Sequence, residues 1–317
     1  MRKFILLSLT VVLATLVSGA SVNAQNARGK SIDVSREILP IPEEYKKPAK
    51  EQGEIVRFDY KVGNGEKYAC VYLPYGYDET TRYEIYYVMH GGGDKVDKVL
   101  GAPGSSIEFK NALDHLIANG VIKPIIVVAP TFNDSARLRG VQNGMFGDVG
   151  AFPQELAQDL MPKLEAKYGT FAETTDEEGL KNSRDHRAFG GFSMGAVTTW
   201  NVLCEDLRYF ATFMPISGDA WQVKPMGGKD ATNETVAALV DAVKKQGYGK
   251  DDFIVYAITG DRDIALPNLD PMMQIMQKSE DGVFGDNVYY RVKKGGFHTI
   301  PALQEYLYNA FQDLYRP

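Results

Sequence analysis

The most constraining feature of this sequence is a strict alternation of short apolar runs with helical patterns. This alternation predicts an α/β fold with a mostly parallel sheet and helices on both faces, because parallel strands need crossover connections. The expected strands span residues 85–89, 125–129, 187–192, 212–216, 253–258 and 288–292. The expected helices lie near residues 107–118, 153–167, 194–203, 234–245, 271–277 and 301–314.

Two further strands are expected before this alternation, over residues 54–62 and 67–73. They are separated by Gly63-Asn64-Gly65, and Asn-Gly between two such runs is typical of a β-hairpin. The sequence contains no internal repeat and no linker, so we expect one domain over residues 53–317. Two Gly-rich stretches, 131–150 and 217–231, fit neither pattern. Each follows an expected strand, where α/β folds bind ligands.

The first residues predict export from the cytoplasm. A basic start, an apolar run from Phe4 to Val17 and small residues at Val22 and Ala24 form a secretory signal peptide over residues 1–24, cleaved after Ala24. The apolar run is shorter than the roughly 20 residues that span a bilayer, so an uncleaved anchor is the weaker alternative. We therefore expect a secreted or periplasmic protein. The Pro-rich residues 25–52 are expected to form an extended leader that lies on the domain or is partly disordered.

The charge of the chain argues against two classes of binding partner, and its cysteine count argues against a disulfide scaffold. A formal net charge of −6, with both signs scattered along the chain, argues against nucleic acid or anionic membranes, which favour a clustered basic face. The two cysteines, Cys70 and Cys204, are too few for a disulfide scaffold and are predicted to be buried free thiols. The sequence leaves the oligomeric state open.

A G-x-S-x-G motif carries the strongest chemical signal. It runs from Gly191 to Gly195, after an expected strand and before an expected helix. Flanking glycines are required where a nucleophilic serine occupies a strained strand-to-helix turn, since a side chain there collides with neighbouring backbone. The alternative is a Gly-rich turn without catalysis. The surrounding strand and helix favour Ser193 as a nucleophile.

A serine nucleophile needs a base that takes its proton. In folds with this motif the acid and then the histidine follow the serine in the chain. Three of the four histidines precede Ser193, which leaves His298, in a Gly-rich turn before the last expected helix. The acid is expected at the end of the 253–258 strand, where both Asp261 and Asp263 are available. One of the two is expected to form a turn.

The oxyanion of an acyl-transfer reaction needs backbone donors. We expect one from Met194, directly after the nucleophile, and one from the turn His90-Gly91-Gly92-Gly93, with Gly92 preferred and Gly93 as the alternative. His90 is expected to be a buried structural histidine. This chemistry requires neither a metal nor an organic cofactor.

Several blocks together resemble the bacterial feruloyl esterases of carbohydrate esterase family 1, within the α/β-hydrolase superfamily. The resemblance is specific in His90-Gly-Gly-Gly and Gly-Phe-Ser193-Met-Gly, and looser over the rest of the chain from about residue 54. In that group the acid usually ends a Gly-x-x-Asp motif, which residues 260–263 match with Asp263 last. The resemblance thus implies Asp263 as the acid. Thr299, Ile300 and Pro301 after His298 depart from the group's usual aromatic residue.

The resemblance implies release of ferulate or related hydroxycinnamates from arabinoxylan, so a plant cell-wall polysaccharide or feruloylated oligosaccharide is the expected substrate. Trp221 could stack on the substrate ring or belong to the core. Asp219 could bind a substrate hydroxyl, and Phe192 could contact the acyl group. The alternatives are an acetylxylan esterase or other acyl hydrolase of this fold, and an inactive carbohydrate-binding protein with an esterase fold.

Overall fold

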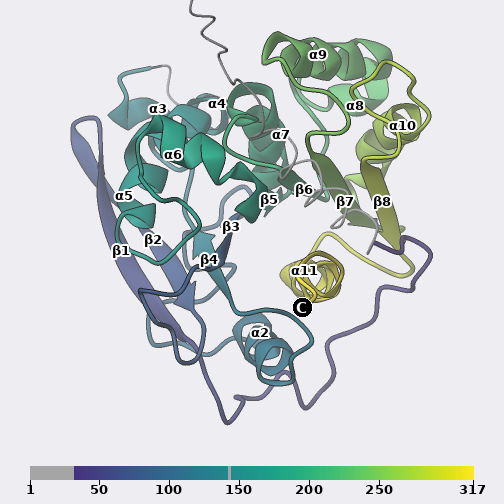
Figure 1. Ribbon diagram of the computed structural model, residues 1–317. Coiled ribbons are helices and arrows are strands. Elements are labelled where there is room, and N and C mark those ends of the chain that lie inside the picture. Colours follow the sequence, from purple (N-terminus) through teal and green to yellow (C-terminus); the bar gives the residue numbers. More distant parts are fainter. Residues whose placement is uncertain (1–31, 142–143) are drawn as a thin grey trace, which may run out of the picture.

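The computed structural model describes residues 32–141 and 144–317, and its centre is an eight-stranded sheet (Figure 1). The strands follow the spatial order β1-β2-β4-β3-β5-β6-β7-β8. β1 and β2 form the antiparallel hairpin that Asn64-Gly65 predicts, and β2 also runs antiparallel to β4. All other neighbours are parallel. The strands are β1 Glu54–Val62, β2 Gly65–Leu73, β3 Glu84–Met89, β4 Ile125–Ala129, β5 Arg187–Phe192, β6 Thr212–Ile216, β7 Ile254–Gly260 and β8 Val288–Lys293.

Both faces of the sheet are buried. Along β4, Ile126 and Val128 face one core, whereas Ile125, Val127 and Ala129 face the other. This division follows from the two-residue period of a strand. A strand buried on both faces is a continuous apolar run, so the sequence predicts the central strands to within two residues.

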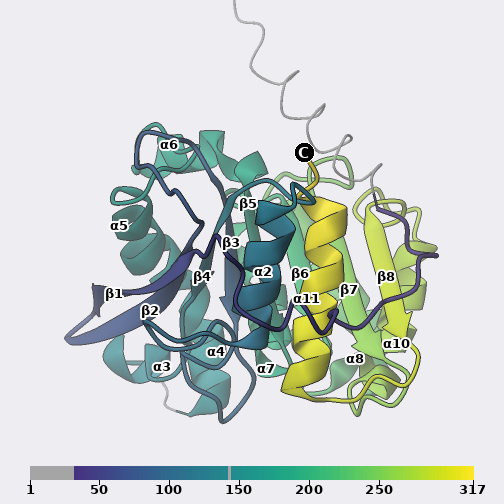
Figure 2. The same cartoon turned by 90° about the horizontal axis from the view of Figure 1, so that it is seen from below.

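The helices divide between the two faces, as Figures 1 and 2 show. Helices α2 and α11 lie together on one face, and α7 packs on the other, against β5 and β6. The larger helices are α2 Glu108–Ala118, α4 Met145–Glu155, α7 Met194–Asp206, α9 Thr232–Lys245, α10 Leu266–Gln277 and α11 Ile300–Leu314. The shorter ones are α3 Ser135–Leu138, α5 Met161–Glu165, α6 Glu177–Asn182 and α8 Gly227–Asp230.

Two helices begin at least five residues earlier than the sequence predicts. The helix expected from residue 153 starts at Met145 and continues through a π-helical turn, Leu156–Leu160, into α5. The helix expected from residue 271 starts at Leu266. In both, a proline that favours a helix start lies inside the helix instead. The two unassigned stretches contain α3 with the first half of α4, and α8.

The leader lies on the domain from residue 32 onward, crossing α2 and α11 (Figure 2). Asn309 of α11 accepts from the backbone N–H of Leu39 at 3.0 Å and donates to its carbonyl at 2.7 Å. On α2, the ring of His115 stacks on Tyr45. The predicted signal peptide lies outside the described residues. Within the described part of the chain, no helix is long and apolar enough to span a bilayer.

Candidate active site

Ser193 lies in the sharp turn between β5 and α7. Its φ of 57° and ψ of −115° are rare for a residue with a side chain. The Ser193 N–H donates to the Ile216 carbonyl at 2.9 Å, which ties the turn to β6. The turn thus holds a strained serine at the carboxyl edge of the parallel strands, the position that the motif predicts.

Crowding around the turn explains its two glycines. A Cβ atom on Gly195 would lie 2.4 Å from the Met89 carbonyl oxygen, and one on Gly191 would lie 2.6 Å from the Gly195 carbonyl oxygen. Both neighbours are backbone atoms, so neither can move aside without shifting a strand or the helix. The G-x-S-x-G spacing is therefore a steric requirement of this turn.

His298 and Asp263 lie together at the same edge of the sheet. His298 Nδ1 is 2.7 Å from Asp263 Oδ1, which also accepts from the Ala265 N–H at 2.8 Å. The Asp263 side chain is fully buried, whereas 19% of the His298 side chain is exposed. A carboxylate on Nδ1 favours the tautomer that carries its proton there and leaves Nε2 as an acceptor.

Asp261 occupies a different position. It is exposed, and its Oδ1 accepts from the backbone N–H of Gly295 at 2.7 Å. The two candidate acids are thus separated by geometry: Asp263 pairs with the imidazole, and Asp261 fixes the turn that precedes it.

The imidazole stands beside the serine turn through Phe192. The rings of Phe192 and His298 are 4.5 Å apart between centroids, and Phe192 itself is buried. Within the described residues, the Ser193 hydroxyl makes no hydrogen bond to His298. Such bonds often tighten only when substrate is bound. Phe192 thus contacts both the core and the imidazole ring, and its expected contact with the acyl group stays a prediction.

The glycine turn after β3 packs directly against the serine turn. A Cβ atom on Gly91 would lie 3.6 Å from Ser193 Cβ, and one on Gly92 would lie 2.9 Å from Met194 Cγ. Met194 begins α7, where the first backbone N–H groups of a helix lack intrahelical acceptors and carry the positive end of the helix dipole. The glycine turn and the start of α7 therefore lie in contact next to Ser193.

His90 is buried and hydrogen-bonded on both ring nitrogens. Nδ1 lies 2.8 Å from the Gly91 carbonyl oxygen and Nε2 lies 2.7 Å from Thr131 Oγ1. Burial lowers the pKa of His90, which favours the neutral ring. As expected from the sequence, His90 holds its own loop.

An aromatic pair joins the loop after β6 to the start of α4. The ring of Trp221 packs on Phe146, with 5.3 Å between centroids, and 57% of Phe146 is exposed. The indole N–H donates to Asp219 Oδ1 at 3.0 Å, and Asp219 Oδ2 accepts from the Gly228 N–H at 2.8 Å. Both Asp219 oxygens are thus used within the protein, so this carboxylate positions Trp221. The sequence did not predict a role for Phe146. Its position in a Gly-rich stretch after an expected strand was the only feature that pointed to the site.

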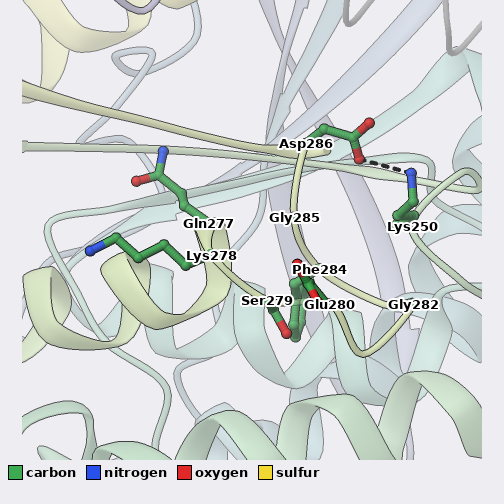
Figure 3. A pocket seen from close by; sticks show the side chains of 9 residues that line it. All are labelled: Lys250, Gln277, Lys278, Ser279, Glu280, Gly282, Phe284, Gly285 and Asp286. Carbon is green, nitrogen blue, oxygen red and sulfur yellow. Dashed lines mark hydrogen bonds and ion pairs between the residues drawn. The ribbon is translucent and has the colours of Figure 1, made fainter.

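A hollow of about 590 Å³ lies elsewhere (Figure 3). Its lining includes Lys250 and Asp286, whose side chains form an ion pair at 3.0 Å. These residues precede β7 and β8, so the hollow is at the amino edge of the sheet, opposite Ser193. It is not part of the candidate site.

The arrangement has the parts that acyl transfer requires: a serine in a strained turn, an imidazole oriented by a buried carboxylate, and backbone donors beside the serine. The family model for esterases, described as "Putative esterase", matches residues 63–313. The chain belongs to this esterase family. Its sheet and helices give it the fold of the α/β-hydrolases.

Known relatives of this esterase include enzymes named for xylan and ferulate. Endo-1,4-beta-xylanase Y of Acetivibrio thermocellus is 38% identical over 86% of this chain and 24% of its own length. An endo-1,4-beta-xylanase/feruloyl esterase of Xylanibacter ruminicola is 28% identical over 57% of this chain and 24% of its own length. The chain spans about a quarter of the length of these curated relatives.

Among solved structures, a mutant of the feruloyl esterase module from Clostridium thermocellum, complexed with sinapinate, is 36% identical to this chain. The match has a TM-score of 0.78 and covers 89% of this chain and 95% of the module.

Proposed function

We propose that this chain is a secreted serine carboxylic ester hydrolase, a feruloyl esterase that releases ferulate or a related hydroxycinnamate from arabinoxylan. The observation that carries the proposal is the 2.7 Å contact of His298 with buried Asp263 beside the strained Ser193. The likeness to a feruloyl esterase module that binds sinapinate supports an aromatic acyl group. Names that combine xylanase and feruloyl esterase support a cell-wall substrate.

In the proposed reaction, Ser193 Oγ attacks the ester carbonyl carbon while His298 Nε2 takes the hydroxyl proton. Asp263 keeps the imidazole in the required tautomer and stabilises the imidazolium that forms. The carbonyl oxygen becomes an oxyanion, which the N–H groups of Met194 and Gly92 stabilise.

Collapse of this tetrahedral intermediate breaks the ester C–O bond. The imidazolium of His298 gives its proton to the leaving sugar oxygen, and the hydroxycinnamoyl group stays on Ser193. A water molecule, deprotonated by His298, then attacks the acyl carbon. The bond between this carbon and Ser193 Oγ breaks, His298 returns the proton to Oγ, and the free acid leaves.

Trp221 and Phe146 are proposed to form the wall that meets the aromatic acyl group. They are adjacent, partly exposed and at the same edge of the sheet as Ser193. Offset or tilted packing of a planar ring on such a pair is favourable.

We also propose that the protein is exported from the cytoplasm. It rests on the signal-peptide pattern of residues 1–24, which precede the leader and the proposed catalytic domain 53–317.

A substrate panel tests the proposal. Purified enzyme is assayed on methyl ferulate, methyl sinapate, 4-nitrophenyl acetate and acetylated xylan, with Ser193→Ala as the control. We expect kcat/KM to be highest for the two hydroxycinnamates and the serine variant to lose roughly 10⁶-fold in kcat. A preference for acetylated xylan would instead favour an acetylxylan esterase. A variant that keeps a tenth of the activity would exclude Ser193 as the nucleophile.

A further inference from the structure

The turn that is proposed to carry the second oxyanion donor lies outside regular secondary structure. It consists of residues 91–94, between the end of β3 at Met89 and residues without regular secondary structure. Its internal hydrogen bond, from the Asp94 N–H to the Gly91 carbonyl, is long at 3.3 Å. Its orientation therefore depends on contacts from outside the turn.

The side-chain hydrogen bonds from outside the turn come from His90 and from one short segment after β4. Thr131 Oγ1 lies 2.7 Å from His90 Nε2, and His90 Nδ1 lies 2.8 Å from the Gly91 carbonyl oxygen. Since Nδ1 faces a carbonyl, it carries the proton, and the Thr131 hydroxyl donates to Nε2. Asn133 Nδ2 donates to the Asp94 carbonyl at 3.0 Å. The Gly91 end of the turn is thus held by Thr131 through His90, and the Asp94 end is held directly by Asn133.

This segment is in turn held by a buried cation. Lys67 Nζ donates to the Thr131 carbonyl at 2.6 Å and to Ser135 Oγ at 3.0 Å. The same ammonium pairs with Glu155 at 2.7 Å, and both side chains are almost completely buried. Removal of either partner would leave a buried unpaired charge, so the pair resists displacement.

We propose that Thr131 and Asn133 are positioning residues for the oxyanion donor of the 91–94 turn, with Lys67 holding their segment in place. The proposal rests on the proposed esterase function and deepens it. Neither side chain is proposed to touch the substrate. Thr131 acts through His90 on the peptide plane that joins the Gly91 carbonyl to the Gly92 N–H, and Asn133 holds the far end of the same turn at the Asp94 carbonyl. Fixed donor geometry is a requirement of an oxyanion site.

A positioning role of this kind affects the transition state more than substrate binding. The oxyanion forms only after attack, so a misplaced donor lowers kcat and leaves KM nearly unchanged. Removal of one oxyanion donor costs roughly 10²–10³-fold in kcat, and we expect a misplaced one to cost roughly tenfold or more. The oxyanion is common to all esters, so the loss is expected to be the same for acetyl and feruloyl substrates.

The test compares Thr131→Val, Thr131→Ser and Asn133→Ala with wild type. Thr170→Val is the matched control, since the Thr170 hydroxyl likewise donates to a buried side chain, that of Glu165 at 3.1 Å, but next to the amino edge of the sheet. Rates are measured on 4-nitrophenyl acetate and methyl ferulate. Two further quantities are measured for each variant. One is its inhibition by phenylboronic acid, which forms a tetrahedral adduct on the serine, and the other is its melting temperature.

We expect Thr131→Val and Asn133→Ala to lower kcat roughly tenfold or more on both esters, with KM within about twofold and weaker boronate inhibition. Thr131→Ser, which keeps the hydroxyl, is expected to restore most of the rate, and Thr170→Val to change only the melting temperature. Unchanged kcat, a loss confined to KM, or a serine variant as slow as the valine variant would overturn the proposal. If wild type hydrolyses the acetyl ester but not methyl ferulate, the feruloyl assignment fails, and the acetyl data still decide this inference.

Discussion

His298 Nδ1 contacts Asp263 Oδ1 at 2.7 Å, while Asp261, two residues earlier, binds the backbone of the loop that carries the imidazole. The segment after β7 thus supplies a buried carboxylate that pairs with the imidazole and an exposed carboxylate that holds the loop before it. The two carboxylates are chemically identical, and only their positions differ.

This difference in position predicts that the same substitution affects kcat very differently at Asp263 and at Asp261. Asp263→Asn is expected to lower kcat by about 10⁴-fold, because an amide at this position no longer selects the tautomer that leaves Nε2 free to accept a proton. Asp261→Asn keeps an acceptor oxygen for the Gly295 N–H and is expected to lower kcat far less. Steady-state kinetics on methyl ferulate measure both. Equal losses, or a larger loss for Asp261, would contradict the assignment.

The serine turn predicts a contrast between two glycines. Gly195→Ala would place a methyl group 2.4 Å from the Met89 carbonyl oxygen, so we expect it to destabilise the fold by roughly 1–3 kcal/mol and to displace Ser193. Gly150→Ala, in the exposed middle of α4 with open space around it, is expected to stabilise the fold by about 0.5–1 kcal/mol. Urea unfolding with activity measurements compares the two. A Gly195→Ala variant with the activity and the free energy of unfolding of wild type would show that the turn tolerates a side chain.

The contacts between the leader and α11 predict a loss of stability without a loss of activity. Asn309→Ala removes both hydrogen bonds to Leu39 and is expected to lower the free energy of unfolding by about 1–3 kcal/mol. The control is Gln312→Ala, whose amide bonds only within the same helix. Thermal unfolding and kcat/KM are the measurements. An Asn309 variant as stable as the control would mean that the leader contributes little.

The two cysteines are free thiols, with Cys70 buried and Cys204 partly buried. Burial raises the pKa of Cys70 to about 11 and that of Cys204 to about 12. At pH 8, below both values, at most about one thiol in a thousand is a thiolate, the reactive form. Iodoacetamide is therefore expected to modify the native protein very slowly, faster as the pH rises, and both thiols rapidly after unfolding. Rapid labelling of native protein at pH 8 would contradict these environments.

The sequence predicts those parts of the fold that local patterns determine. The runs 125–129, 187–192 and 212–216 match β4, β5 and β6 residue for residue, because a strand buried on both faces must be apolar throughout. Helix starts at Met145 and Leu266 were missed because Pro153 and Pro271 lie inside helices, although proline is typical of a first turn.

Other features depend on contacts between distant residues. The leader is polar and aperiodic, and its position is set by partners such as Asn309, about 270 residues away. The choice between Asp261 and Asp263 depends on where the loop before His298 folds back. The pairing of Phe146 with Trp221 joins two stretches that the sequence left unassigned, the start of α4 and the segment after β6. No local pattern encodes these contacts.

The proposed acyl-site wall makes the last prediction. If Trp221 and Phe146 receive the aromatic acyl group, Trp221→Ala is expected to lower kcat/KM on methyl ferulate more than on 4-nitrophenyl acetate. The acetyl group is too short to use the whole wall. An aromatic contact contributes roughly 0.5–1.5 kcal/mol beyond simple burial, so the ratio of the two constants is expected to change by at least a few fold.

The only other tryptophan, Trp200, provides the matched control, because it is fully buried and its indole N–H donates to the Gly218 carbonyl at 3.1 Å. Trp200→Phe is expected to lower the melting temperature and to leave the ferulate-to-acetate ratio unchanged, since a core cavity weakens the fold without discriminating between acyl groups. A Trp221 variant that behaves in the same way, less stable but with an unchanged ratio, would place Trp221 in the core. The wall would then have to consist of other residues, and Phe146→Ala on the same two esters would test whether the exposed ring acts without its partner.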